Sequence, residues 1–277
     1  MGKRSVARLV VAATVAMIAV LPTARSVGAE VPIPSSMSSV GDSITRAFNA
    51  CGFYVDCTSR SWSTGDYTSV DSHYLRIKAK NPAITGRNYN DARSGAKMAE
   101  LNAQVTTAGD RGVEYVTILM GANDACTSSE STMTPVATFR SQLDTALGTL
   151  KGKVPNAAVF IASIPDIKRL WYVGHHDFWA VSAWNGYKVC QSMLANPTSH
   201  STTDEARRDR VRQRVVDFNN ELALACSAYG PTCRFDGNAT FNYPFVLSQV
   251  SGWDYFHPNR SGQATLASLT YAAGFNW

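Results

Sequence analysis

Two segments far apart in the chain carry residue types that serve acyl transfer. Ser43 lies in a Gly-Asp-Ser turn, and His257 lies in an Asp-Tyr-Phe-His-Pro segment at residues 254–258. A serine hydroxyl becomes an effective nucleophile when a base accepts its proton, and that base needs a third group to hold its tautomer. Asp254 can reach His257 Nδ1 from a turn, and Pro258 keeps the preceding residue from continuing a helix. The pattern predicts Ser43 as nucleophile, His257 as general base and Asp254 as the residue that orients the imidazole.

Acyl transfer also needs hydrogen-bond donors that face the oxygen on which negative charge develops. Gly95 can present a backbone N–H with no side chain in the way, and Asn123 can present its side-chain amide. We further expect residues 44–50 to open a helix whose N–H groups point at Ser43. Each part alone also has an ordinary explanation, such as a turn or a structural histidine. Together, and in this order along the chain, these residues indicate a catalytic site for acyl transfer.

The elements that must position these residues can be read from hydrophobic patterning. Short apolar runs predict buried strands at residues 115–120 and 157–164, with weaker ones at 38–40, 88–92 and 233–235. Apolar residues at spacings of three and four predict helices at residues 135–151, 204–226 and 261–273. In the first of these helices, Thr134 is expected as the N-cap and Pro135 at the first helical position.

Strands that alternate with helices predict an α/β protein. We expect a three-layer α/β/α sandwich with a central, mostly parallel sheet. In such folds the reactive groups gather at the carboxyl ends of the strands. Residues 41–43, 93–95 and 121–124 each follow one predicted strand, so they should meet at one edge of the sheet.

This ordered set of motifs resembles the SGNH/GDSL hydrolase family. The matching blocks are Gly41-Asp42-Ser43, Gly95, Gly121-Ala122-Asn123-Asp124 and residues 254–258. The resemblance implies the SGNH hydrolase fold, a catalytic set of Ser43, His257 and Asp254, and an oxyanion hole from Ser43, Gly95 and Asn123. Residues 60–65 and 123–126 look like the phospholipase B branch. The first strand is more polar than is usual for the family, and the GxSxG pattern of α/β-hydrolases is absent.

The first 29 residues read as a secretory signal peptide. A basic start is followed by an apolar run at residues 9–21 and by small residues that end at Ala29. We expect cleavage there and a single hydrolase domain over residues 30–277. The formal net charge of +5 falls to +1 for that domain, because four basic residues and no acidic ones precede residue 30. This balance does not indicate nucleic-acid binding, and no apolar run is long enough for a membrane span.

The cysteine content fits an export compartment in which disulfides persist. Short gaps favour the pairs Cys51–Cys57 and Cys226–Cys233, which leaves Cys126 with Cys190. Six cysteines allow 15 pairings, so this is a preference. No CxxC spacing is present, so structural disulfides are favoured over metal ligation and no metal is expected.

Four other features have competing explanations. Six aromatic residues between Trp171 and Tyr187 are expected to form an acyl-binding wall or lid, or a satellite core held by Cys190. The charged residues 204–214 are expected to be a solvated helix face, with a docking patch for anionic lipid head groups as the alternative. Trp62 is expected either to line the cleft beside Ser43 or to pack in the core, with neither position favoured. The pair His175-His176 is expected to lie in a polar loop and not in a metal site.

The expected function is that of a secreted, extracellular serine ester hydrolase that forms an acyl-enzyme on Ser43 and needs no cofactor. Lipid or phospholipid esters are the first choice of substrate, with transient contact with lipid surfaces. A carbohydrate acetylesterase on the same fold is the nearest alternative. A non-catalytic secreted binding protein is the alternative of another class, because a fold does not fix a function. A monomer is favoured.

Overall fold

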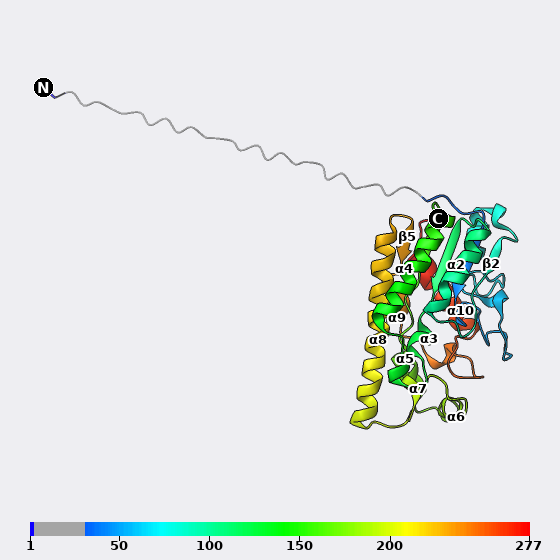
Figure 1. The fold of residues 1–277 in the computed structure, drawn as a ribbon, viewed down its shortest axis with the longest axis vertical. Coiled ribbons are helices and arrows are strands. Elements are labelled where there is room, and N and C mark those ends of the chain that lie inside the picture. Colours follow the sequence, from blue (N-terminus) through cyan, green and yellow to red (C-terminus); the bar gives the residue numbers. More distant parts are fainter. Residues whose placement is uncertain (3–30) are drawn as a thin grey trace. The chain divides into compact units, whose positions relative to one another are not determined.

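The central feature of the computed structural model is one parallel sheet of five strands (Figure 1). The structure describes residues 1–2 and 31–277, so nearly all of the predicted signal peptide, residues 1–29, lies outside the described residues. The strands are β1 (Met37–Gly41), β2 (Asn88–Asn90), β3 (Tyr115–Leu119), β4 (Ala158–Ile161) and β5 (Cys233–Phe235). Their order is β2-β1-β3-β4-β5, and every neighbouring pair is parallel.

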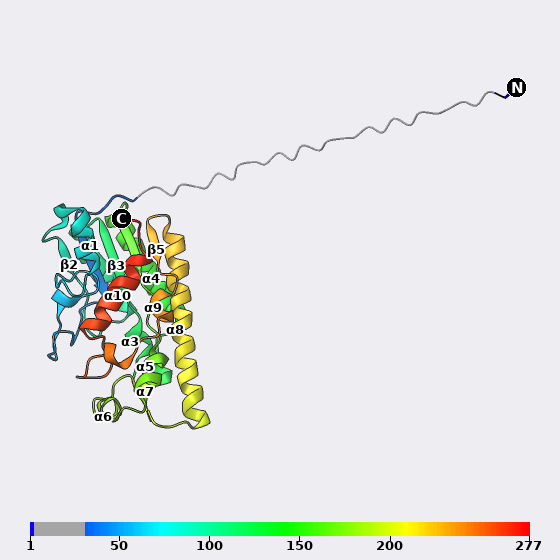
Figure 2. The ribbon, with the colours of Figure 1, turned by 180° about the vertical axis from the view of Figure 1, so that it is seen from behind.

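Helices cover both faces of this sheet. The helices are α1 (His73–Lys80), α2 (Leu101–Asp110), α3 (Ala122–Ala125), α4 (Val136–Lys153), α5 (Ile167–Gly174), α6 (Phe178–Gly186), α7 (Gln191–Leu194), α8 (Thr202–Tyr229), α9 (Ala239–Asn242) and α10 (Arg260–Ala272). Short 3-10 helices span Thr58–Arg60, Pro82–Ile84, Met98–Glu100, Glu130–Thr132 and Leu247–Gln249. Helices α2 and α4 lie on one face (Figure 1), α1 and α10 lie on the other (Figure 2), and α8 runs along the β5 edge. The predicted three-layer α/β/α sandwich is confirmed.

Burial on both faces explains the composition of the central strands. All residues of β3 and β4 are buried, and they are largely valine, isoleucine, leucine and phenylalanine. The polar strand β1 is buried as well, and its serines have partners. Ser38 Oγ donates to Asp91 Oδ2 at 2.7 Å, and Ser39 Oγ shares a hydrogen bond of 3.0 Å with Thr64 Oγ1. Since each hydroxyl is satisfied, the polar sequence is compatible with a central strand.

The predicted helices exist, but their ends differ from the expected ones. Helix α4 begins at Val136 with Pro135 as the N-cap, because the Thr134 hydroxyl donates to Asp124 Oδ1 at 2.7 Å instead of capping the helix. Helix α8 is longer than predicted at both ends and is capped by Ser201, whose side chain accepts from Asp204 N. The first of these boundaries depends on a side-chain partner in another segment, and the second on a local cap.

The expected helix at residues 44–50 is wrong, since this segment is a series of turns. Ala47 and Asn49 have φ values of 50° and 67°, which a right-handed helix does not allow. The Phe48 N–H donates to the Ser43 carbonyl at 3.0 Å, so the chain closes a wide turn directly after the serine. This turn brings Asn49 back toward the centre of the molecule, where it is 1% exposed.

The six cysteines form three disulfides within residues 31–277. The pairs are Cys51–Cys57, Cys126–Cys190 and Cys226–Cys233, the pairing that the spacing favoured. In the described part of the chain no helix combines the length and the apolar character that crossing a membrane would require.

The charged stretch of α8 is only partly a solvated face. Arg208 is fully buried, donates to the carbonyls of Ser199 and Asn196 at 2.8 Å, and lies 4.2 Å from the centre of the Trp171 ring. Arg207 donates to the Ser192 and Ala195 carbonyls. The expectation of a wholly solvated face is therefore wrong at both positions, because these two arginines satisfy the irregular backbone before α8.

Candidate active site

The segments that carry the predicted chemistry meet at the carboxyl ends of the strands. Ser43 follows β1, Gly95 follows β2, Asn123 lies in α3 directly after β3, and His257 lies in the loop before α10. Gly41 allows the close approach of β1 and β3 that this requires, since it lies opposite Leu119 in their register. A Cβ at Gly41 would stand 2.2 Å from the Leu119 carbonyl oxygen, so a larger residue would displace the turn that carries Ser43.

Two buried glutamines fix the backbone on either side of Ser43. Gln104 accepts from Gly41 N at 2.7 Å and donates to Gly41 O at 2.9 Å. Gln263 donates to the Ile44 carbonyl at 2.8 Å and accepts from Trp62 N at 2.9 Å. Trp62 is thus part of the buried core, since its exposure is 0%. Sequence analysis did not single out either glutamine, because nothing in the local pattern shows which distant backbone they contact.

Ser43, His257 and Asp254 form one continuous chain of polar contacts. Ser43 Oγ lies 2.7 Å from His257 Nε2, and His257 Nδ1 lies 2.5 Å from Asp254 Oδ2. Asp254 Oδ1 also accepts from the backbone N–H groups of Phe256 and His257 at 2.9 and 3.1 Å. The carboxylate is almost fully buried, at 3% exposure, and is held in position by its own turn. In this geometry the imidazole can accept the proton of the Ser43 hydroxyl, and the carboxylate can hold the imidazole in position.

Asn49 is a further member of this network, which sequence analysis missed. Its Nδ2 donates to Asp254 Oδ2 at 2.7 Å, the same oxygen that faces His257 Nδ1. Asn49 lies two residues before Cys51, and the disulfide between Cys51 and Cys57 closes the loop that follows it. The expected helix over residues 44–50 concealed this role. The asparagine itself was the one sequence signal for a turn here, because asparagine adopts positive φ more readily than most residues.

A cavity of about 270 Å³ opens beside the serine. Its lining includes Ser43, Gly95, Asn123 and His257. Gly95 has φ of 80°, a conformation that favours glycine. Within residues 31–277, neither the Ser43 N–H nor the Gly95 N–H donates to another protein group, and the Asn123 amide donates one of its two hydrogens to the Ala96 carbonyl at 3.0 Å. Three N–H donors thus remain for an oxygen atom in this cavity.

Two buried carboxyl groups lie behind the serine. The pKa of Asp42 is raised from 3.8 to about 7, mainly by burial and to a smaller extent by the charge of Asp124, while the Ile44 N–H and His257 oppose the shift. Burial also raises the pKa of Asp124, whose carboxylate accepts from Met98 N and Thr134 Oγ1. Asp42 Oδ1 accepts from Ile44 N at 2.9 Å, and Oδ2 has no hydrogen-bond partner in the described residues. The burial of this incompletely paired carboxyl therefore costs stability in the turn that carries Ser43.

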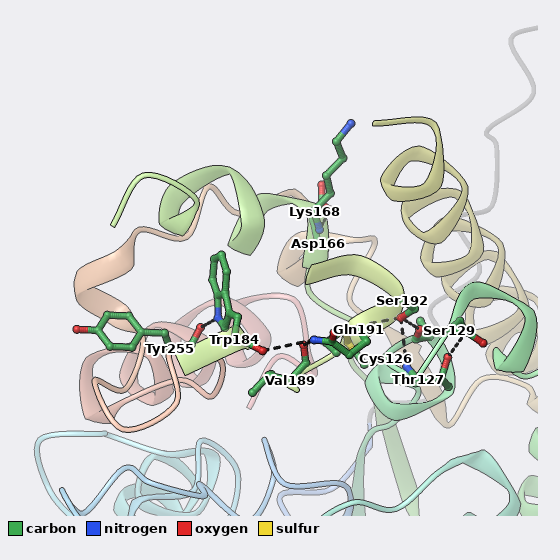
Figure 3. Close-up of a disulfide and its surroundings, with 12 residues drawn as sticks. Cys126, Thr127, Ser129, Asp166, Lys168, Trp184, Val189, Gln191, Ser192 and Tyr255 are labelled. Atoms are coloured by element: carbon green, nitrogen blue, oxygen red, sulfur yellow. Dashed lines mark hydrogen bonds between the residues drawn. A yellow bond between two sulfur atoms is a disulfide. The ribbon is translucent and has the colours of Figure 1, made fainter. Parts of the chain in front are cut away.

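The Cys126–Cys190 disulfide joins two sides of the cavity, and both cysteines line it. Figure 3 shows the loop that follows α6 around this bond, with Val189 and Gln191 beside it. In the same view the indole of Trp184 donates to the Tyr255 carbonyl, a bond of 2.8 Å. Helix α6 is thereby attached to the loop that carries His257.

The aromatic cluster divides into two groups. Trp171 and Trp184 are buried in the main hydrophobic core and not in a satellite core, while Tyr172, Phe178, Trp179 and Tyr187 are exposed. None of the six lines the cavity that holds Ser43. His175 stacks on Trp171, and Asp177 caps α6. Among residues 1–2 and 31–277, no group of three or more His, Cys, Asp or Glu side chains is arranged to hold a metal ion.

Comparisons with known proteins agree with this architecture. The family model described as GDSL-like lipase/acylhydrolase matches residues 39–270. An extracellular lipase from Streptomyces rimosus is 20% identical, with 86% of this chain and 99% of that chain covered and a TM-score of 0.52.

Two other solved structures have the same fold. A putative GDSL-like lipase from Parabacteroides merdae is 16% identical, with 86% and 94% covered and a TM-score of 0.54. A catalytic mutant of an acetylxylan esterase from Geobacillus stearothermophilus is 14% identical, with 87% and 95% covered and a TM-score of 0.55. No curated protein matches the sequence. At these identities the likeness to the solved structures shows the fold alone.

Proposed function

The chain belongs to the GDSL-like lipase/acylhydrolase family and is a carboxylic ester hydrolase, and we propose that it acts through an acyl-enzyme on Ser43. The contact of 2.7 Å between Ser43 Oγ and His257 Nε2, beside a cavity with three available N–H donors, carries this proposal. A hydroxyl, a base and an oxyanion site around one cavity are the parts that acyl transfer requires.

The proposed reaction proceeds in two steps. Ser43 Oγ attacks the ester carbonyl carbon as His257 Nε2 takes its proton, and the Ser43 N–H, the Gly95 N–H and the Asn123 amide stabilise the oxyanion. His257 then gives the proton to the leaving alcohol, which departs and leaves Ser43 acylated. In the second step a water molecule loses a proton to His257 and attacks the acyl carbon. The bond between this carbon and Ser43 Oγ then breaks as His257 returns the proton to Ser43 Oγ, which releases the carboxylic acid and the free serine. Asp254 keeps His257 Nδ1 protonated and stabilises the imidazolium.

Fluorophosphonate labelling combined with ester assays tests the mechanism. Wild type should bind one probe at Ser43 and release p-nitrophenol from its acetate ester, and Ser43→Ala should do neither while keeping its thermal unfolding temperature. Ser39→Ala is a matched control, because Ser39 is a buried serine of β1 outside the cavity. A folded wild-type protein that never labels would favour the non-catalytic binding protein. Substantial turnover by Ser43→Ala would exclude the proposed nucleophile.

Lipid or phospholipid esters are our first choice of substrate. The exposed residues Phe178, Trp179 and Tyr187 of α6 and the turn after it support transient contact with a lipid surface, because Val189, two residues beyond, lines the cavity. Phe178→Ser with Trp179→Ser should then weaken binding to phosphatidylcholine vesicles and lower the rate on vesicle substrate, without changing the rate on p-nitrophenyl acetate. Activity confined to acetylated sugars would favour the carbohydrate acetylesterase instead.

Export from the cell is also part of this proposal. The signal-peptide pattern of residues 1–29 supports it, as do the three disulfides. N-terminal sequencing of protein collected from the culture medium should begin at Glu30. Recovery of the protein only inside the cell, with residues 1–29 attached, would contradict export.

A further inference from the structure

A second cavity, separate from the one that contains Ser43, lies between α5 and the loops of the catalytic segments. Its volume is about 70 Å³, and ten of its twelve lining residues are apolar, among them Leu170, Val173 and Phe245. The two polar lining side chains are already engaged. Asp166 caps α5 and pairs with an arginine of α8, and Gln249 Nε2 donates to Thr265 Oγ1 at 2.8 Å. The cavity therefore offers an apolar surface and few free polar groups.

This cavity adjoins three of the four segments that carry proposed catalytic chemistry, those of Ser43, Asn123 and His257. Ile44 follows Ser43, Ala122 precedes Asn123, and Phe256 and Pro258 flank His257, and all four line the cavity. Phe256 lines the Ser43 cavity as well, so its side chain stands between the two. Its ring packs edge-on against His257 with 5.0 Å between centroids. An apolar group attached to a carbonyl at Ser43 would pass the Phe256 ring to enter this cavity, where it would be shielded from water.

We propose that this cavity receives the first carbons of the acyl chain of the substrate, which makes the protein selective for alkanoyl over acetyl esters. The inference rests on the proposed acyl-enzyme at Ser43 and adds the acyl class to it. A volume of 70 Å³ has room for about five groups of the size of a water molecule, so butanoyl and hexanoyl groups fit. Longer chains extend out of the cavity and gain little more. A sugar would find almost no unengaged polar partner there.

A series of p-nitrophenyl esters tests the proposal, because the leaving group stays constant. Each methylene removed from water is expected to raise kcat/KM by about fourfold, so the rate should rise from acetate through butanoate to hexanoate and then level off. Val173→Phe fills the cavity and should reduce the hexanoate-to-acetate ratio of kcat/KM at least tenfold. It should leave acetate within twofold of wild type. Leu170→Ala enlarges the cavity and should move the plateau toward octanoate.

Tyr172→Trp is the matched control, since Tyr172 neighbours Val173 on α5 but is exposed and lies outside the cavity. It should leave the whole series unchanged. The proposal is overturned if wild type shows no gain beyond acetate, or if Val173→Phe lowers acetate and hexanoate by the same factor. Unchanged acetate hydrolysis shows that the variant is folded. If the proposed acyl-enzyme mechanism itself is wrong, the result is different: Ser43 is not labelled and no ester is hydrolysed.

Discussion

Asn49 and Asp254, 205 positions apart in the chain, are joined by a hydrogen bond of 2.7 Å between two almost fully buried side chains. The Asn49 amide donates to the carboxylate oxygen that His257 Nδ1 also contacts. Asp254, the proposed orienting acid, is therefore held from both sides, by its own turn and by the segment that follows Ser43. Loss of either side should misplace the imidazole without removing any group that touches the substrate.

We expect Asn49→Gly to lower kcat about tenfold or more with little change in KM. Hydrogen bonds to charged groups contribute about 1.5–3 kcal/mol, and 1.36 kcal/mol corresponds to a factor of ten in rate. Glycine keeps the positive φ of 67°, so the variant removes the amide and not the turn. Asn238→Gly is the control, because Asn238 has a similar φ of 66° and no contact with Asp254. Equal effects of the two substitutions on kcat would contradict a positioning role for Asn49.

The Cys51–Cys57 disulfide should act on the site through Asn49. Replacing both cysteines by serine is expected to lower kcat, and the loss should be much smaller in the Asn49→Gly background, because the two changes disturb one network. The Cys226–Cys233 pair is a matched control with a sequence separation of 7 against 6. Its removal should cost stability, by about 2 kcal/mol, and leave kcat unchanged. Strictly additive losses in kcat would show that the disulfide acts by another route.

Asp42→Asn should stabilise the protein at alkaline pH. Because burial raises the pKa of Asp42 from 3.8 to about 7, the folded state holds a proton between these values that the unfolded chain releases. The contribution of this group to the free energy of unfolding therefore falls as pH rises through the window, by at most about 4 kcal/mol, and stays low above it. An asparagine at this position does not ionise, so it removes this pH-dependent loss of stability, and its side-chain oxygen still accepts from the Ile44 N–H.

Urea unfolding of Asp42→Asn and wild type at pH 4.5 and pH 8 measures this effect. The variant should gain about 1–4 kcal/mol relative to wild type on going from the lower to the higher pH. The same stability difference at both pH values would mean that the pKa of Asp42 is not raised in the folded state.

His73 should make the protein sensitive to acid. Burial lowers the pKa of this imidazole from 6.5 to about 3, and its nitrogens are engaged with Tyr115 Oη and Thr270 Oγ1 at 2.9 and 2.8 Å. The unfolded chain gains a proton as pH falls below about 6.5, whereas the folded state stays neutral until about 3. Stability is therefore complete above pH 6.5 and declines between these values.

We expect His73→Gln to cost about 1–3 kcal/mol at pH 7.5, because the glutamine loses ring packing with Trp62 and Phe160. The variant should also lose less stability than wild type between pH 6.5 and pH 4. Thermal unfolding followed by circular dichroism at several pH values measures both. Parallel acid dependence in the two proteins would assign the acid sensitivity to other groups.

The sequence alone was sufficient for the fold class and for the residues nearest the proposed reaction. Apolar runs on β3 and β4 and periodic helices such as α4 are local signals, since each element must bury its own face. Ser43, Gly95, Asn123 and His257 could be proposed because each stands directly at a strand end or beside a proline. The cysteine pairing was favoured by two short gaps in the sequence, which left Cys126 with Cys190.

Only the tertiary structure decided how these parts are supported. The turn at residues 44–50, the contact of Asn49 with Asp254, and the two glutamines that hold the nucleophile backbone depend on partners distant in the chain. The same is true of the buried arginines of α8 and of the apolar cavity beside Phe256. A hydrogen bond or a cavity is a property of atoms brought together from several segments, whereas patterning and turn residues report only what each segment favours by itself.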